Sequence, residues 1–169
     1  MYKKKITFLI STLSGGGAEG VCVGIANSFA ENGWKVDLIV LNLNNEAYLN
    51  RISKKVNLVV LNVNHARYSS FSLFKYILKN NVKTILVFNY ELSVVLTILR
   101  ILFRIKINII SRNISTFSAK MSQFYQLSLW DRYVVAPLIK YFYHRVDYVV
   151  NQSNGMRDDL ISIYPKLNS

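Results

Sequence analysis

Residues 11–20 read Ser-Thr-Leu-Ser-Gly-Gly-Gly-Ala-Glu-Gly (STLSGGGAEG) and directly follow the apolar run ITFLI at residues 6–10. A short apolar run closed by glycines is typical of a buried strand that turns into a helix. Gly15, Gly17 and Gly20 also satisfy G-x-G-x-x-G, the dinucleotide-binding fingerprint of such turns. The stretch therefore predicts a strand–turn–helix unit with three interpretations: a nicotinamide site, another phosphate-binding turn, or a tight turn without a ligand.

Outward from this turn, apolar runs alternate with helical patterns along the whole chain. Strands are predicted at residues 6–10, 36–41, 56–61, 84–88, 107–111 and 146–150, and helices at 18–32, 69–79, 92–103, 127–145 and 155–163. Pro137 should kink or split the 127–145 helix, and Ser153 should cap the last one. Segment 117–125 has no clean period and is expected to be a mobile loop or a short helix. Strands separated by helices predict an α/β fold, a Rossmann-like doubly wound parallel sheet with helices on both faces.

The composition favours one folded domain with an excess of positive charge. Of 169 residues, 51% are hydrophobic and 18% are charged, which argues against a disordered chain. The single cysteine, Cys22, excludes an internal disulfide, fits a reducing cytoplasm and is expected to be buried. The formal net charge is +12, and residues 95–145 hold eight basic residues against one acid. Such a surface prefers an anionic partner, unless the proteins of this organism are simply rich in lysine.

The second predicted strand argues against a nicotinamide site. A dinucleotide site needs an acid about 20 residues beyond the glycines, at the end of that strand. The strand ends Leu41-Asn42-Leu43, and its acid, Asp37, stands at its beginning. The glycine turn nevertheless lies where ligands bind in such folds, outside the carboxyl ends of the strands beside the first strand.

Three motifs resemble glycosyltransferase family four, the retaining enzymes with the two-domain GT-B fold. SGGGAE at residues 14–19 resembles the family's GGAE turn, and ISRN at residues 110–113 resembles its loop after the fifth strand. VVNQSNGMRDDL at residues 149–160 resembles its passage VxxSxGxxxDL at the end of the amino-terminal domain. Two positions depart from the common pattern: Gly20 replaces a frequent Arg, and Arg112-Asn113 stand where many members have His. The chain is therefore nearer the subgroup with SRN or ERN loops, often found in capsule, O-antigen and protein-glycan assembly.

The resemblance implies a domain division and a function. Residues 1–163 form the acceptor-binding domain, residues 164–169 begin the interdomain linker, and the carboxyl-terminal donor domain is absent from this chain. The intact gene is expected to continue for about 150–200 residues as a second such domain. The implied reaction moves a sugar, with retention, from a nucleotide sugar to a glycan or polyprenyl-diphosphate-linked acceptor in bacterial surface-polysaccharide or glycan assembly. The location is cytoplasmic, peripheral at the inner face of the cell membrane, and this fragment alone should be inactive.

Candidate substrate-binding residues follow the first, fourth and fifth predicted strands at one edge of the sheet. They are Gly15, Gly16, Gly17, Glu19, Asn89, Tyr90, Arg112 and Asn113. Glycine amides can approach a diphosphate or sugar hydroxyls closely, and a guanidinium can hold either group bidentately. The catalytic residue is unassigned, because front-face attack with retention needs no base from this half. No metal-ligand spacing is present, so the sequence predicts no metal or cofactor, only the nucleotide sugar as substrate, bound mainly by the missing domain.

Two segments bear on contact with a membrane. Segment 92–105 is apolar nearly all round, and segment 130–145 mixes aromatic with basic residues: Trp130, Arg132, Tyr133, Lys140, Tyr141, Phe142, Tyr143 and Arg145. Such a mixture suits the interface of an anionic bilayer, although both helices can also pack on the sheet. Two alternatives to a glycosyltransferase stay open: a nucleotide-binding Rossmann oxidoreductase or regulatory domain, and a non-catalytic basic membrane-binding module. No nucleic-acid-binding motif is recognisable.

Overall fold

A single parallel sheet organises the chain in the computed structural model, which describes residues 4–43, 47–165 and 167. Its strands are β1 (Lys5–Ile10), β2 (Lys35–Val40), β3 (Val56–Val60), β4 (Thr84–Val87), β5 (Asn108–Arg112) and β6 (Tyr148–Val150). Their order is β3-β2-β1-β4-β5-β6, and all the pairings are parallel. The predicted doubly wound sheet is confirmed. The order of strands reverses between β1 and β4, which is where such sheets open a crevice for ligands.

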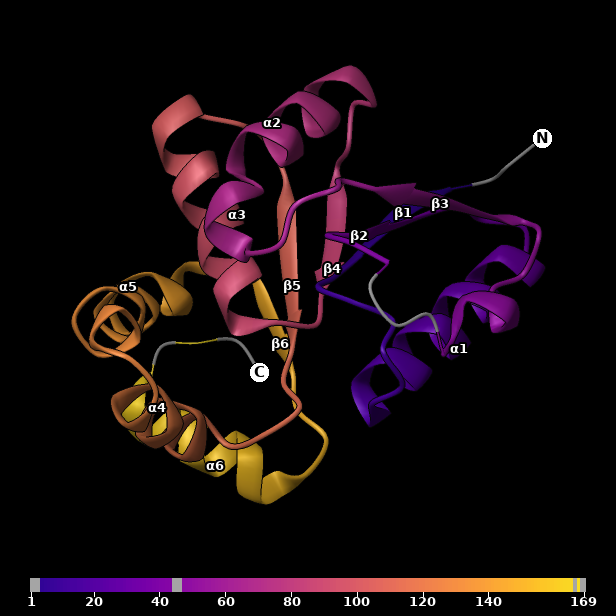
Figure 1. Ribbon diagram of the computed structural model, residues 1–169. Helices are drawn as coiled ribbons and strands as arrows, with labels where there is room; N and C mark the ends of the chain where they lie inside the picture. Colours follow the sequence, from indigo (N-terminus) through magenta and orange to yellow (C-terminus); the bar gives the residue numbers. More distant parts are fainter. Residues whose placement is uncertain (1–3, 44–46, 166, 168–169) are drawn as a thin grey trace.

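Helices cover both faces of the sheet (Figure 1). Helix α1 (Gly17–Glu31) lies on one face, and α2 (Ser70–Lys79), α3 (Tyr90–Phe103) and α5 (Ala136–Phe142) lie on the other. Helices α4 (Phe117–Gln126) and α6 (Asn154–Ile163) pack against each other. Single turns complete the chain at η1 (Leu49–Arg51), η2 (Ala66–Tyr68), η3 (Asp131–Val135) and η4 (Tyr143–Arg145). Linker positions 166, 168 and 169 lie outside the described residues.

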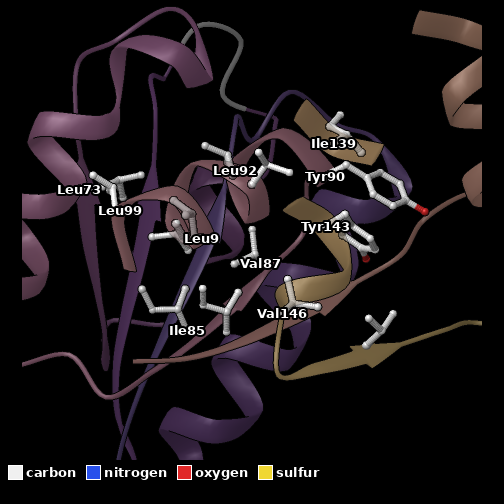
Figure 2. Packing of buried hydrophobic residues seen from close by; sticks show 14 of the residues in the cluster. Leu9, Leu73, Ile85, Val87, Tyr90, Leu92, Leu99, Ile139, Tyr143 and Val146 are labelled. Carbon is white, nitrogen blue, oxygen red and sulfur yellow. The ribbon is translucent and has the colours of Figure 1, made fainter. Parts of the chain in front are cut away.

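Side chains that alternate along the strands pack into two apolar cores, one on each face of the sheet. Phe8 and Leu38 face α1, where they pack with the buried Cys22. Burial raises the pKa of the Cys22 thiol, and its predicted burial is confirmed. Leu9 and Val87 point to the opposite face and pack beneath α2 and α3 in the larger core (Figure 2). The period of two along β1 therefore fills both layers from a single strand.

The structure decides between the two alternatives predicted for the segment after residue 116. Residues 117–126 form the regular helix α4, so the mobile-loop alternative is wrong; the Thr116 hydroxyl caps the helix by accepting from the Ala119 amide. The 127–145 helix is divided into η3, α5 and η4, and its first two residues are not helical. Within η3 the Ala136 amide donates to the Asp131 carbonyl five residues back. This wider turn directly precedes Pro137, which has no amide hydrogen to donate, so the predicted interruption is confirmed.

A buried ion pair ties β1 to β2. Asp37 is 1% exposed; Lys5 Nζ lies 3.0 Å from its Oδ2, and Asn57 Nδ2 donates to its Oδ1 at 2.8 Å. Burial by itself would raise the pKa of the Asp37 carboxyl. The hydrogen bonds from Asn57 and Lys5 outweigh it, so this pKa is lowered below its ordinary value of 3.8. The acid in strand two is therefore structural.

Asp37→Asn is expected to lower the free energy of unfolding by about 1–3 kcal/mol near neutral pH, because Lys5 loses its buried partner. The folded-state pKa of Asp37 is depressed, so its contribution is present above pH 3.8 and disappears as the pH falls through the folded value. Urea unfolding of both proteins across this range measures the effect. Glu31→Gln, at the exposed end of α1, is the control. A difference that persists undiminished in acid would rule out the ion pair as its cause.

Candidate functional site

The glycine turn after β1 has one backbone position that favours glycine, and Gly20 in the first turn of α1 lies close to another side chain. Gly15 has φ +109°, a conformation that L side chains rarely adopt, and a Cβ there would lie 3.2 Å from the Ala47 Cβ. A Cβ on Gly20 would lie 2.9 Å from the Tyr48 hydroxyl. The replacement of the family's frequent Arg by Gly20 therefore matches the close approach of Tyr48 to α1.

The beginning of α1 leaves backbone amides available to a ligand. Gly16 occupies the N-cap position, where no side chain caps the helix, and nothing lies within 4 Å of a Cβ built on Gly17. A Cβ on Gly16 would touch the Glu19 carboxylate, so that carboxylate folds back over the turn. The turn thus combines amide donors with one carboxylate acceptor, which is a set suited to hydroxyl groups as well as to phosphate.

Arg112 ends β5 on the same side of the sheet as α1. Its guanidinium carbon lies 5.4 Å from the centre of the Phe88 ring, and Phe88 belongs to the core that contains Cys22. Gln152, with its amide oxygen turned toward the guanidinium, accepts from Nη1 at 3.3 Å and from Nη2 at 3.1 Å. Partial burial lowers the pKa of Arg112, and no described acid forms an ion pair with it. Among the described residues, no acid therefore lies within ion-pair distance of its positive charge.

Asn89 and Tyr90 use their side chains to hold the edge of the sheet together. Asn89 Oδ1 accepts from the Ser11 amide at 3.0 Å, and its Nδ2 donates to Ser11 Oγ at 3.3 Å. Tyr90 begins α3 instead of lying in a loop; it is 4% exposed and donates from its hydroxyl to the Ser115 carbonyl at 2.9 Å. Asn89 connects the ends of β1 and β4, and Tyr90 supports the segment after β5 from below.

Asn113 belongs to a buried polar network that the sequence did not reveal. It is 1% exposed; its Nδ2 donates to Asn151 Oδ1 at 2.8 Å, and its Oδ1 accepts from the Tyr143 hydroxyl. That hydroxyl also lies 2.9 Å from Ser111 Oγ, which in turn is 3.0 Å from Ser93 Oγ. The network joins α3, β5 and η4 directly beneath Arg112 and fixes its position in the sheet.

Tyr143 follows the second alternative for segment 130–145, packing on the sheet. It is 0% exposed, and its ring centre lies 4.9 Å from that of Tyr90 (Figure 2). Burial raises the pKa of its hydroxyl, so Tyr143 is protonated near neutral pH and can donate. Phe142 is half-buried against the same core.

A cavity of about 360 Å³ opens on the opposite face, between α3 and the η3–α5 segment. Ser11 and Asn89 line it at the edge of the sheet, together with Arg67 of η2 and His65, which directly precedes η2. The apolar part of its lining on α3, η3 and α5 consists of Leu92, Val95, Ile98, Val134, Val135, Leu138 and Ile139. Gly15, Gly16, Gly17, Glu19 and Arg112 do not line it. The predicted substrate-binding residues thus fall into three groups. The glycine turn and Arg112 lie on the α1 side, and Asn89 lines the cavity. Tyr90 and Asn113 are buried.

Neither a metal centre nor a membrane span is visible in the described part of the chain. No three His, Cys, Asp or Glu side chains come together there as metal ligands. None of the helices in residues 4–43, 47–165 and 167 is long and apolar enough to cross a bilayer.

Comparison with known proteins identifies the family. The model of glycosyltransferase family 4 matches residues 15–167. The structure resembles the apo form of the lipopolysaccharide outer core galactosyltransferase WaaB, with a TM-score of 0.66 and 15% identity over 94% of this chain and 42% of that one. It also resembles sucrose-phosphate synthase from Thermosynechococcus elongatus, with a TM-score of 0.68 and 14% identity over 98% of this chain and 46% of that one. Among curated protein sequences none matches significantly.

The likeness extends over nearly all of this chain but over less than half of each of those structures. The six-stranded parallel sheet with its helices therefore corresponds to one half of a GT-B architecture. The chain belongs to glycosyltransferase family 4.

Proposed function

We propose that this chain is the acceptor-binding half of a retaining glycosyltransferase. The reaction moves a sugar from a nucleotide sugar to a glycan or polyprenyl-linked acceptor in bacterial surface-polysaccharide or glycan assembly. The observation that carries the proposal is the carboxyl edge of the sheet. There the uncapped amides of the glycine turn lie on the α1 side together with Arg112, which forms no ion pair with a described acid. Donor binding is assigned to a second domain, since the matched structures are more than twice as long as the matched region.

The candidate residues divide into binding and positioning roles. Amides of Gly15, Gly16 and Gly17 approach the donor diphosphate or acceptor hydroxyls, and Glu19 accepts hydrogen bonds from hydroxyls. Arg112 supplies the charge that holds a phosphate or a hydroxyl pair. Asn89 contacts the acceptor at the mouth of the cavity. The buried Tyr90 and Asn113 position the edge through Ser115 and Tyr143.

Titration with NAD tests this proposal against the oxidoreductase alternative. Leu41 and Asn42 follow strand β2, and Asn42 Nδ2 donates to the Val63 carbonyl at 3.1 Å. Among the described residues, no carboxylate directly follows this strand, where a ribose hydroxyl would need one. We expect calorimetry to show no NAD binding to the 169-residue chain. Micromolar binding would favour the Rossmann oxidoreductase or regulatory domain over the glycosyltransferase half.

An exposed apolar and basic surface favours peripheral attachment at the inner face of the cell membrane. Trp130, directly before η3, is 48% exposed, and Tyr133 on η3 and Tyr141 on α5 are 65% and 59% exposed. The side chains of Arg132 and Lys140 are also exposed. Aromatic residues interleaved with basic ones suit the interface of an anionic bilayer. The acceptor edge would then be held close to lipid-linked substrates.

Flotation with anionic liposomes measures this attachment. Each basic residue near the surface contributes on the order of 1 kcal/mol, so binding should be weak and should fade as salt rises. Arg132→Glu combined with Lys140→Glu should abolish flotation while the fold is retained. Lys54→Glu combined with Lys55→Glu is the matched control, because both lysines are exposed before β3 at the other edge of the sheet. Equal binding to neutral liposomes would contradict the electrostatic attachment.

A further inference from the structure

We propose that Gln152 is a positioning residue, which holds the Arg112 guanidinium so that its side edge stays free for an anionic group of the substrate. The proposal rests on the proposed function, which assigns substrate binding to Arg112, and adds a residue that acts through Arg112. The observation that carries it is the pair of hydrogen bonds that Arg112 Nη1 and Nη2 donate to the Gln152 amide oxygen, at 3.3 Å and 3.1 Å.

The neighbours of Gln152 are fixed on both sides, although its own side chain is exposed. On one side, Asn151 Oδ1 accepts from Asn113 Nδ2 at 2.8 Å, which ties the end of β6 to the end of β5. On the other side, Ser153 occupies the N-cap position of α6, and its hydroxyl accepts from a backbone amide of that helix at 3.3 Å. The backbone at Gln152 is therefore held beside the end of β5, where Arg112 lies.

The contacts of the guanidinium leave one bidentate edge open. An arginine has five N–H donors in a planar fork, which form an end edge between the two terminal nitrogens and a side edge that includes Nε. Gln152 takes the end edge of Arg112, and the Phe88 ring, 5.4 Å from the guanidinium carbon, covers one face. Among the described residues, no group accepts a hydrogen bond from Arg112 Nε. The side edge can therefore bind two oxygens of a phosphate or a carboxylate.

The group that orients Arg112 carries no charge. An amide oxygen aligns the guanidinium through hydrogen bonds without cancelling its charge, whereas a carboxylate in the same place would do both. Because no acid in the described part of the chain forms an ion pair with Arg112, its charge remains for a ligand. Gln152→Glu therefore separates two effects: it should keep the alignment and remove the free charge.

The loop after β6 has another attachment to the sheet besides the Gln152 side chain. The hydrogen bond between Asn113 and Asn151 already joins this loop to β5, and the buried Tyr143 hydroxyl supports Asn113 from the other side. Substitutions of exposed residues such as Gln152 usually change stability little. A positioning role thus predicts a loss of affinity for substrate groups without a matching loss of stability.

Titration of the 169-residue chain with inorganic pyrophosphate tests the proposal. Calorimetry gives the affinity, and NMR of the isotope-labelled chain follows the Nε–H signal of Arg112. We expect saturable binding that shifts this signal, because the anion accepts from the side edge. Gln152→Leu has nearly the same size but no acceptor, and it should weaken binding about three- to tenfold, as for the loss of one hydrogen bond. Glucuronate is the second arm, and its affinity relative to pyrophosphate tells whether the edge prefers a carboxylate or a phosphate.

Gln152→Glu gives the sharpest result, because stability and binding should respond differently. The carboxylate should pair with Arg112 and leave Tm unchanged or raised, while the affinity for pyrophosphate falls at least about tenfold. Gln123→Glu on α4 is the matched control, since Gln123 is exposed and the substitution changes the net charge equally. It should alter the affinity by less than about twofold, because a distant exposed charge is screened by salt.

A comparison of double variants shows whether Gln152 acts through Arg112. In an Arg112→Lys background, Gln152→Leu should change the affinity for pyrophosphate by less than about twofold, because an ammonium has no planar edge to align. A residue that contacts the anion itself, or that only holds the loop in place, would cause the same loss in both backgrounds.

Three results would overturn the proposal. They are the absence of saturable binding of both anions, an affinity of Gln152→Glu equal to that of the parent chain, and an equal loss from Gln152→Leu in both backgrounds. Failure of the proposal leaves the glycosyltransferase function intact if Arg112→Ala still reduces sugar transfer by the complete protein. Failure of the glycosyltransferase function itself is distinguished by NAD binding to the chain.

Discussion

Tyr143→Ala is expected to lower the free energy of unfolding by about 3–5 kcal/mol, the range found when large aromatic residues are removed from cores. The side chain is 0% exposed, and its ring centre lies 4.9 Å from that of Tyr90 and 5.6 Å from that of Phe117. The substitution leaves a cavity and also removes the hydroxyl that bonds to Asn113. Because domains are stable by only about 5–15 kcal/mol, much of the protein should unfold at moderate urea.

Tyr143→Phe separates the ring from its hydroxyl. It keeps the packing but leaves the buried Asn113 and Ser111 without this partner, which should cost about 1–3 kcal/mol. Urea unfolding followed by circular dichroism measures both variants. Tyr141→Ala, two residues earlier and 59% exposed, is the control and should change the free energy of unfolding by less than about 0.5 kcal/mol. Similar losses in Tyr143→Ala and Tyr141→Ala would contradict the assignment of Tyr143 as the centre of this network.

Arg112→Ala is expected to reduce the kcat/KM of sugar transfer by the complete protein about 10- to 100-fold. A charge-assisted hydrogen bond contributes about 1.5–3 kcal/mol, and each 1.4 kcal/mol is a factor of ten. Arg112→Lys keeps the charge but loses the planar fork, so it should restore only part of the activity. The comparison is made with the product of the full reading frame, because the donor site is assigned outside this chain.

Two controls show whether Arg112 acts on substrate or on the fold. Arg157→Ala, an exposed arginine on α6, should leave kcat/KM unchanged. Unfolding of Arg112→Ala should match that of the parent protein within about 1 kcal/mol, since Gln152 and Phe88 lose only a partly exposed partner. Unchanged transfer by a folded Arg112→Ala protein would remove Arg112 from the binding site.

The strands and the glycine turn were predictable because their signals are local. The apolar runs give the strands directly, and the lack of hairpin turns between them requires a parallel sheet. The position of the turn at the carboxyl edge then follows from topology alone. The glycine at position 20, where the family frequently has arginine, could be explained only from the structure. The Tyr48 hydroxyl that approaches Gly20 comes from a later segment of the chain.

The directions of the polar side chains could not be predicted in the same way. Asn113 follows Arg112 immediately, yet Arg112 packs over Phe88 toward α1 while Asn113 is buried with Tyr143. Alternation along β5 separates them, but the burial of Asn113 depends on η4 covering that position. The sequence around Tyr143 does not tell whether this residue is exposed or buried, because aromatic residues among basic ones occur both on membrane surfaces and at the edges of cores.

The cavity between α3 and η3–α5 could not be predicted from the sequence either. Its walls come from α3 and from η3–α5, and each helix contributes only one stripe of apolar residues that reads as ordinary core. The turn at η3 sets the direction of the helix before Pro137, and proline predicts an interruption without giving its geometry. Whether two apolar stripes meet fully or leave a gap is decided by packing between segments about thirty residues apart.

Sugar transfer by the complete protein tests the central claim most directly. The product of the full reading frame is incubated with radiolabelled nucleotide sugars and a bacterial lipid extract, and the labelled product is analysed for its anomeric configuration. The account predicts label in the glycan or lipid-linked fraction from at least one nucleotide sugar, with the donor's configuration retained. A folded protein that transfers label from none of them, or that inverts the configuration, would contradict it.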